Sequence, residues 1–180
     1  WTGQLGKLAG LDIPVFPVRR CKFFTAPFPF DKIPARTPFI IDRHDGFVLR
    51  REGEGILLGY NRPDEPSSFD TTPDWSLVPE MVERVVRRVP VLAEAQIMSA
   101  YAGLYEMTPD QSGIISAVPG VEGLYVLAGF SGHGFMHGPA AGQLMAEMIA
   151  DGRAHTVDVA ALSLDRFARG EVLFEPMTFM

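Results

Sequence analysis

Apolar residues in the first half of the chain occur in short runs separated by Gly, Pro and Asp. This is the pattern of β-strands joined by turns. Asp45-Gly46 is a strong two-residue hairpin signal, and the prolines between Pro27 and Pro38 predict a loop outside any sheet interior. The polar segment 61–74 is interpreted as a surface loop. The strands predicted for this antiparallel meander are 16–25, 39–42, 47–51 and 56–60.

Three segments have the wider spacing of apolar residues that is typical of helices. Residues 1–10 predict a short helix that ends at a glycine. Residues 76–89 predict an amphipathic helix, with apolar side chains on one side, Glu and Arg on the other, and Pro90 as its end. Residues 133–150 predict a longer helix, which the Asp151-Gly152 pair terminates.

The second half of the chain also contains strand signals. Residues 95–106 have an ambiguous period and are interpreted as a strand. The runs 113–118 and 123–128 flank a Pro-Gly pair and predict a hairpin. Segment 158–169 is interpreted as a loop or short helix, and the tail to Met180 as irregular. Strands paired in an antiparallel or mixed sheet, with helices placed between them, predict an α+β fold.

Composition narrows the class of protein. The chain has 180 residues, is 47% hydrophobic and has a net charge of −6, so it predicts a globular protein that does not bind nucleic acid. No apolar stretch is long enough to span a bilayer. The single Cys21 cannot form an intrachain disulfide, which favours a reducing, cytoplasmic location. Because the chain begins at Trp1 and not at Met, we interpret it as a fragment of a longer protein.

The strongest candidate site is the Gly-rich segment between the last predicted strand and the long helix. Gly129, Gly132 and Gly134 allow positive φ and bring bare main chain close to a ligand. A strand-to-helix turn of this kind presents free N–H groups and the positive end of the helix, which can hold a phosphate or a polarised ring edge. The alternative is a tight turn that needs glycines only for its geometry.

Ser131 and the neighbouring histidines offer two other readings. Ser131 could be a hydrolase nucleophile, but the G-x-S-x-G pattern requires Gly where His133 stands. Its other reading is a hydroxyl that caps the helix. His133 and His137 have the i, i+4 spacing of a zinc helix, but Gly134 replaces the expected Glu and no third ligand is evident, so we predict no metal.

Aromatic and basic side chains could form a substrate pocket. Tyr60, Tyr101 and Tyr105, together with Phe47, could line it, although ordinary sheet core is the alternative for each of them. An arginine such as Arg50 could bind a carboxylate.

Several motifs resemble, in order and spacing, the C-terminal part of the D-amino-acid-oxidase-like FAD-dependent flavoproteins. The similarity is to the branch that contains the sarcosine oxidase beta subunit, dimethylglycine dehydrogenase and glycine oxidase. It covers nearly the whole chain. The matching segments are 1–6, 13–20, 101–110, 121–126, 129–135 and 165–167, with the helix end at 151–152.

The resemblance implies a two-domain enzyme that binds FAD and a small amine or amino acid. It implies that residues 1–15 end a FAD-domain segment, 16–107 form the substrate domain, 108–156 are the returning FAD-domain hairpin and helix of a Rossmann-like domain, and 157–180 are the tail. The nucleotide-binding G-x-G-x-x-G motif of that domain is absent from this chain. The turn implied to lie against the flavin contains Gly129, Phe130, Ser131, Gly132, His133, Gly134, Phe135 and Met136. A Cβ at Gly132 is therefore expected to block the approach of the flavin.

Three positions depart from the family pattern. Gly103 stands where some relatives have a Cys that carries a covalent flavin link, so FAD is expected to be non-covalent at Gly103. Met136 replaces a carboxylate-binding Lys, and Asn61 replaces a His. The implied substrate-side residues are Tyr60, Asn61, Arg50 and Tyr105, and no residue is assigned a catalytic role.

We predict a fragment of a FAD-dependent oxidoreductase that oxidises the C–N bond of a secondary amine or amino acid, sarcosine-like or glycine-like, by hydride transfer to flavin. The parent chain could form homo- or hetero-oligomers. The alternatives are a serine hydrolase that uses Ser131 and a non-catalytic binding subunit.

Overall fold

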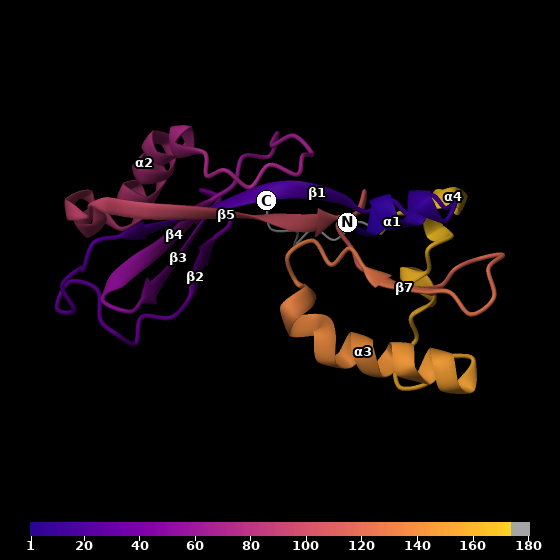
Figure 1. The fold of residues 1–180 in the computed structure, drawn as a ribbon. Coiled ribbons are helices and arrows are strands. Elements are labelled where there is room, and N and C mark those ends of the chain that lie inside the picture. Colours follow the sequence, from indigo (N-terminus) through magenta and orange to yellow (C-terminus); the bar gives the residue numbers. More distant parts are fainter. Residues whose placement is uncertain (174–180) are drawn as a thin grey trace. The chain divides into compact units, whose positions relative to one another are not determined.

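The computed structural model describes residues 1–173, which form two compact units. The first unit contains residues 1–18 and the chain from residue 105 onward, and the second contains residues 19–104. Strands β1 (Phe16–Thr25) and β5 (Ile97–Met107) each begin in one unit and end in the other (Figure 1). The unit boundaries therefore fall inside strands, whereas the sequence placed them at 15/16 and 107/108.

The second unit is organised around a five-stranded sheet of order β2-β3-β4-β1-β5. β2 (Ile40–Asp42), β3 (Phe47–Glu52) and β4 (Gly55–Tyr60) form the predicted meander. β1 pairs antiparallel with β4, with Phe23 opposite Leu58. Gly46, at φ 72°, provides the left-handed conformation that the tight turn between β2 and β3 requires.

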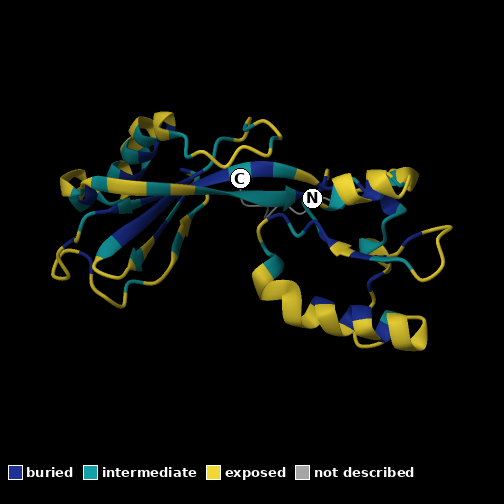
Figure 2. Cartoon of the chain, viewed as in Figure 1, coloured by how far each residue is buried: buried dark blue, intermediate teal, exposed yellow. Residues whose placement is uncertain are grey.

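One face of this sheet carries the core of the second unit. Figure 2 shows the buried residues along its strands. The amphipathic segment forms a 3₁₀ turn, η1 (Trp75–Leu77), followed by helix α2 (Val78–Arg88), and a second 3₁₀ helix, η2 (Pro90–Glu94), follows it. The apolar side of α2 covers that face of the sheet. The buried residues of this core include Phe23, Phe47, Leu49, Ile56, Leu58, Leu77, Met81 and Val85.

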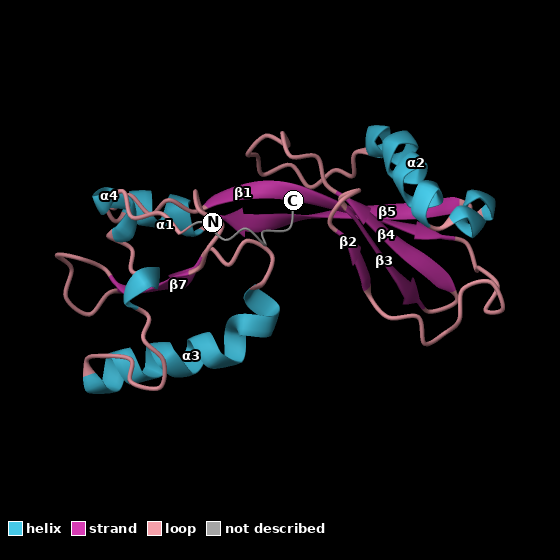
Figure 3. Cartoon of the chain, turned by 180° about the vertical axis from the view of Figure 1, so that it is seen from behind, coloured by secondary structure: helices cyan, strands magenta, loops and turns pink. Residues whose placement is uncertain are grey.

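The first unit contains α1 (Thr2–Leu8), the hairpin of β6 (Ile114–Ala117) and β7 (Tyr125–Ala128), and helix α3 (Gly134–Asp151) (Figure 3). The last described elements are η3 (Ala160–Leu162) and α4 (Arg166–Arg169). One face of the hairpin packs on the 11–15 segment, and Ile115 packs on α3. Gly152 ends α3 in a left-handed conformation, as its sequence predicts.

The structure confirms an α+β fold with antiparallel sheets, and it confirms the strands, the hairpin and the helices that the sequence predicts. The ambiguous segment 95–106 is indeed a strand. Segment 158–169 contains two short helices. The prediction for the tail concerns residues 174–180 and lies outside the described residues. The assignment of the units to FAD and substrate binding stays a prediction. Within residues 1–173, no helix has both the length and the apolar character needed to cross a membrane.

Candidate functional site: the turn before helix α3

In the turn between β7 and α3, three residues have a positive φ. Gly129, Ser131 and Gly132 have φ values of 76°, 51° and 94°. The expectation of positive φ is correct for Gly129 and Gly132 and wrong for Gly134, which instead begins α3. Ser131 adopts the left-handed conformation, which costs a non-glycine residue about 1–2 kcal/mol. A strained serine in this turn was not foreseen from the sequence.

The strain at Ser131 is compensated by contacts with the segment that follows β5. Its main-chain N–H donates to the Glu106 carbonyl oxygen at 3.1 Å. Its Oγ accepts from the Thr108 N–H at 3.4 Å and donates to the Gly129 carbonyl oxygen at 3.3 Å. The Ser131 residue is only 3% exposed. The hydroxyl therefore serves the turn itself.

These contacts change both earlier readings of Ser131. The residue at the N-cap of α3 is His133, and no side chain caps the helix, so the capping interpretation is wrong. A hydrolase nucleophile must be exposed and hydrogen-bonded to a base. Ser131 Oγ instead lies buried among main-chain groups, so its position gives no support to a hydrolase.

Two glycines of the turn are required by neighbouring side chains. A Cβ on Gly132 would lie 2.7 Å from Cζ of the Tyr105 ring and closer still to Cε2. A Cβ on Gly129 would collide with the Thr108 methyl group. The expected reason for Gly132, room for the flavin, is therefore incomplete. The ring of Tyr105 already fills the space where a Cβ would stand.

The start of α3 leaves main-chain donors available. The N–H groups of the first helical turn have no partner within a helix, and here no side chain caps them and no acidic residue lies in that turn. Phe135 is fully exposed at 101% and Met136 at 68%. The positive end of an 18-residue helix therefore coincides with exposed apolar side chains. Such a combination can hold a group that is both planar and partly negative.

A small cavity lies beside the same turn. Its volume is about 270 Å³, and its walls include Gly113, Ile115, Phe130, His133, His137 and Leu144. The His133 and His137 rings stack with centroids 6.0 Å apart, and Phe130 lies 6.1 Å from His137. Within the described part of the chain, no cluster of three or more His, Cys, Asp or Glu is placed to bind a metal.

A buried ion pair between Asp110 and Arg166 stabilises the segment after β5, which contacts the turn through Thr108. Arg166 donates from Nε to Asp110 Oδ2 at 2.8 Å and from Nη2 to Oδ1 at 3.0 Å. Asp110 also accepts from Thr108 Oγ1, the Ser112 N–H and the Leu173 N–H. Burial opposes ionisation of Asp110, but the hydrogen bonds from Arg166 and from these main-chain groups hold its pKa below the usual value.

Sequence reasoning did not find this pair. Asp110 and Arg166 each lie in a segment that matches the family pattern, but they are 56 positions apart and nothing in their spacing indicates a contact. The signal that the sequence offered was Arg166 next to Phe167 in a short helical segment. An arginine that is buried at such a position needs an acidic partner.

The substrate-side residues predicted in the second unit are not brought together as a pocket. Tyr60 is buried at 4% and donates from its hydroxyl to Glu80 Oε1 at 2.6 Å. Phe47 is also in the core. Arg50 is exposed and pairs with Glu52, whereas Tyr101 is 52% exposed. Tyr60 and Phe47 therefore belong to the core of the second unit, and a substrate role for Tyr60 stays a prediction.

Asn61 and Gly103 remain candidates. Asn61 Oδ1 is buried and has no hydrogen-bond partner among the described residues. Gly103 lies in β5 with no atom within 4 Å of the position that a Cβ would occupy. Asn61 thus offers a hydrogen-bond acceptor to a ligand, and Gly103 offers free space beside its Cα.

Comparison with known proteins supports the resemblance found in the sequence. A family model described as "FAD dependent oxidoreductase" matches residues 1–148. FAD-dependent oxidoreductase domain-containing protein 1 of Bos taurus is 31% identical over 95% of this chain and 38% of its own length. Dimethylglycine dehydrogenase of Rattus norvegicus is 26% identical over 94% of this chain and 22% of its own.

A solved structure gives the same result for the fold. L-proline dehydrogenase from P. horikoshii matches with a TM-score of 0.85 and 30% identity, over 96% of this chain and 46% of that one. The chain thus spans less than half the length of the relatives that it matches.

Proposed function

Because the chain belongs to the family of FAD-dependent oxidoreductases, we propose that it is part of an enzyme that oxidises the C–N bond of a secondary amine or amino acid. When bound, FAD supplies the two-electron acceptor: the α C–H bond of the substrate breaks as a hydride, and water then hydrolyses the imine to an amine and a carbonyl compound. Sarcosine-like and glycine-like substrates are the proposed class. The relatives are named for dimethylglycine, glycine and proline.

The observation that carries the proposal is the uncapped start of α3 beside the left-handed turn. We propose that the main chain of Gly129–Gly132 and the N–H groups of Gly134, Phe135 and Met136 hold the flavin. These groups fit it, because the helix end is positive, its donors are unused, and Phe135 and Met136 offer exposed apolar contact. Phe130 and His133 complete the turn beside the cavity.

We propose non-covalent attachment at Gly103, because glycine has no side chain that could form a bond to the cofactor. The space above its Cα is open among the described residues. We also propose a cytoplasmic location for the enzyme, in keeping with a single cysteine, Cys21, that is buried and free.

The test is anaerobic titration of the purified full-length protein. We expect a yellow protein whose flavin absorbance bleaches on addition of an N-methyl amino acid and returns when oxygen or an artificial acceptor is admitted. If no amine or amino acid that is added bleaches the flavin, the proposed substrate class is wrong. A colourless full-length chain would contradict the enzyme and leave the binding-subunit reading. Ser131 is expected to stay unlabelled by a fluorophosphonate.

A further inference from the structure

Lys22 of the second unit lies outside the hydrophobic core of that unit. β1 alternates across its sheet, so that Cys21 and Phe23 enter the core under α2 while Lys22 points to the opposite face. Lys22 lies opposite Gly59 of β4 in the strand register. A Cβ on Gly59 would be 2.7 Å from Lys22 Nζ and 2.7 Å from a Val48 methyl carbon. The ammonium group therefore lies over a glycine in the middle of the sheet.

No carboxylate of residues 1–173 is paired with this ammonium group. Among the described residues, the charges that act on Lys22 come from Arg20, on the same strand, and from Cys21. Burial, followed by the repulsion from Arg20, lowers the pKa of Lys22 to about 8. A cation that is partly buried without a counter-ion is destabilised, unless a ligand provides the opposite charge.

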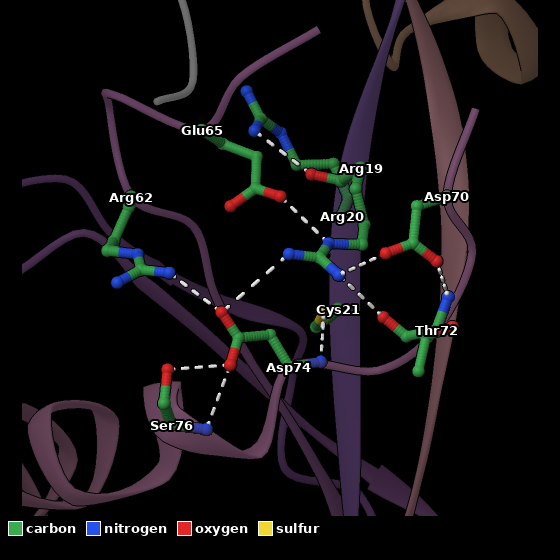
Figure 4. Close-up of polar contacts among 9 residues, drawn as sticks. All are labelled: Arg19, Arg20, Cys21, Arg62, Glu65, Asp70, Thr72, Asp74 and Ser76. Atoms are coloured by element: carbon green, nitrogen blue, oxygen red, sulfur yellow. Dashed lines mark hydrogen bonds and ion pairs between the residues drawn. The ribbon is translucent and has the colours of Figure 1, made fainter. Parts of the chain in front are cut away.

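The acidic residues drawn beside β1 in Figure 4, Glu65, Asp70 and Asp74, are paired with arginines. Arg19 donates to Glu65 at 2.8 Å and to Asp70 at 3.2 Å. Arg62 pairs with Asp74 at 2.7 Å. Arg19 precedes Lys22 by three positions, so strand alternation places it on the Cys21 side, and the Asp74 N–H indeed donates to Cys21 Sγ at 3.4 Å.

The same region holds an unused acceptor. Asn61 follows Gly59 by two positions, directly after the end of β4, and its buried Oδ1 lacks a partner among residues 1–173. An unsatisfied buried acceptor costs about 1–3 kcal/mol. A ligand with both a carboxylate and an N–H group would satisfy a cation and an acceptor in one region.

We propose that Lys22 binds the carboxylate of the substrate on the face of the five-stranded sheet opposite α2. The inference rests on the proposed function and makes it more specific: the substrate is an amino acid, not a simple amine. Gly59 is required so that the Lys22 side chain can lie flat against the sheet. Lys22 thereby takes the carboxylate-binding role for which the sequence suggested Arg50, which pairs with Glu52.

The test uses calorimetric titration of the full-length protein with benzoate and with its neutral isostere benzamide. Lys22→Met is expected to weaken benzoate binding about 10- to 100-fold, the range for a hydrogen bond to a charged group, and to leave benzamide binding unchanged. Lys22→Arg is expected to retain most of the affinity. The control Lys7→Met removes an exposed lysine of α1 and should change neither ligand. Equal losses for both ligands, or unchanged benzoate binding, would overturn the proposal.

Further measurements separate this inference from the proposed function. Calorimetry does not need flavin, so Lys22 can be tested even if the protein proves colourless. If the flavin is reduced by amines but Lys22→Met leaves KM for amino acids unchanged, the carboxylate site is wrong and the enzyme stands. Tighter binding of inorganic phosphate than of benzoate would also overturn the carboxylate assignment. Gly59→Ala should weaken benzoate binding in the same direction, because its methyl group displaces the ammonium.

Discussion

Two residues in the Gly129–His133 turn show how local requirements and a binding role can share one position. Gly132 accommodates the Tyr105 ring, and Ser131 ties the turn to Thr108. A glycine that fits a cofactor and a glycine that fits a neighbouring ring look identical in the sequence. Only the position of Tyr105 reveals the second requirement.

Gly132→Ala is expected to destabilise the protein by about 1–3 kcal/mol, because its φ of 94° strains any L-residue and its Cβ meets Tyr105. Gly142→Ala is the matched control, since that exposed helical glycine has no atom within 4 Å of the Cβ position. It is expected to stabilise by about 0.5–1 kcal/mol. Chemical denaturation measures both changes. A neutral Gly132→Ala would show that Tyr105 moves freely.

The buried Asp110–Arg166 pair gives a second prediction at the scale of single residues. Arg166→Met should cost about 3–5 kcal/mol, because it leaves Asp110 charged and buried. Adding Asp110→Asn should recover part of that loss in a double-mutant cycle. Arg169→Met breaks only exposed pairs and should cost below about 1 kcal/mol. Additive losses in the cycle would argue against a direct coupling.

At the scale of elements, the sequence predicts strands and helices well and their contacts poorly. β1 and the β6–β7 hairpin follow from apolar runs and turn residues, which are local signals. The Asp110–Arg166 pair, the Tyr105 contact with Gly132 and the burial of Tyr60 are set by packing between distant segments. Local patterns carry no information on such contacts.

Helix α3 is joined to the segment that follows it by one carboxylate. Glu147 accepts from the Thr156 hydroxyl and from the N–H groups of Thr156 and His155. These hydrogen bonds lower its pKa to about 2. A depressed folded-state pKa stabilises above the unfolded value of 4.5, and this stabilisation is lost as pH falls toward 2.

We therefore expect the wild-type protein to lose stability more steeply than Glu147→Gln between pH 4.5 and pH 2. Melting temperatures across that range measure the difference. The control Asp151→Asn lies on the same helix with an exposed side chain, whose ion pair in the described part of the chain is with His155. Parallel melting curves for wild type and Glu147→Gln would contradict the role of these hydrogen bonds.

The start of α3 gives a prediction for the cofactor. Met136→Asp places a negative charge at the positive helix end, where it competes with a partly negative ring for the same N–H groups. We expect lower flavin occupancy in the full-length protein, measured by the ratio of flavin to protein absorbance. Arg153→Asp, just beyond the other end of α3, makes a larger change in net charge and should leave occupancy unchanged. Equal losses in both would indicate a general charge effect.

At the scale of the whole molecule, the most exposed large apolar residues lie in the first unit. Trp1, Leu5 and Leu8 of the α1 segment are 69%, 64% and 87% exposed, and Phe135 of α3 is 101% exposed. Surfaces of this kind usually contact another element or ligand. The chain spans only 38% of the length of its Bos taurus relative.

Phe135→Glu tests whether the cofactor or another segment covers the exposed surface at the start of α3. In the 180-residue chain alone, it should change stability by less than about 0.5 kcal/mol, because the side chain makes no buried contact, and it should reduce binding of a hydrophobic dye. In the full-length protein, the same change should lower flavin content, whereas Val157→Glu, at a site 57% exposed, should not. A carboxylate buried beside the edge of a flavin would weaken flavin binding, because a buried charge without a partner is costly. If Phe135→Glu leaves the flavin content of the full-length protein unchanged, the start of α3 does not face the cofactor.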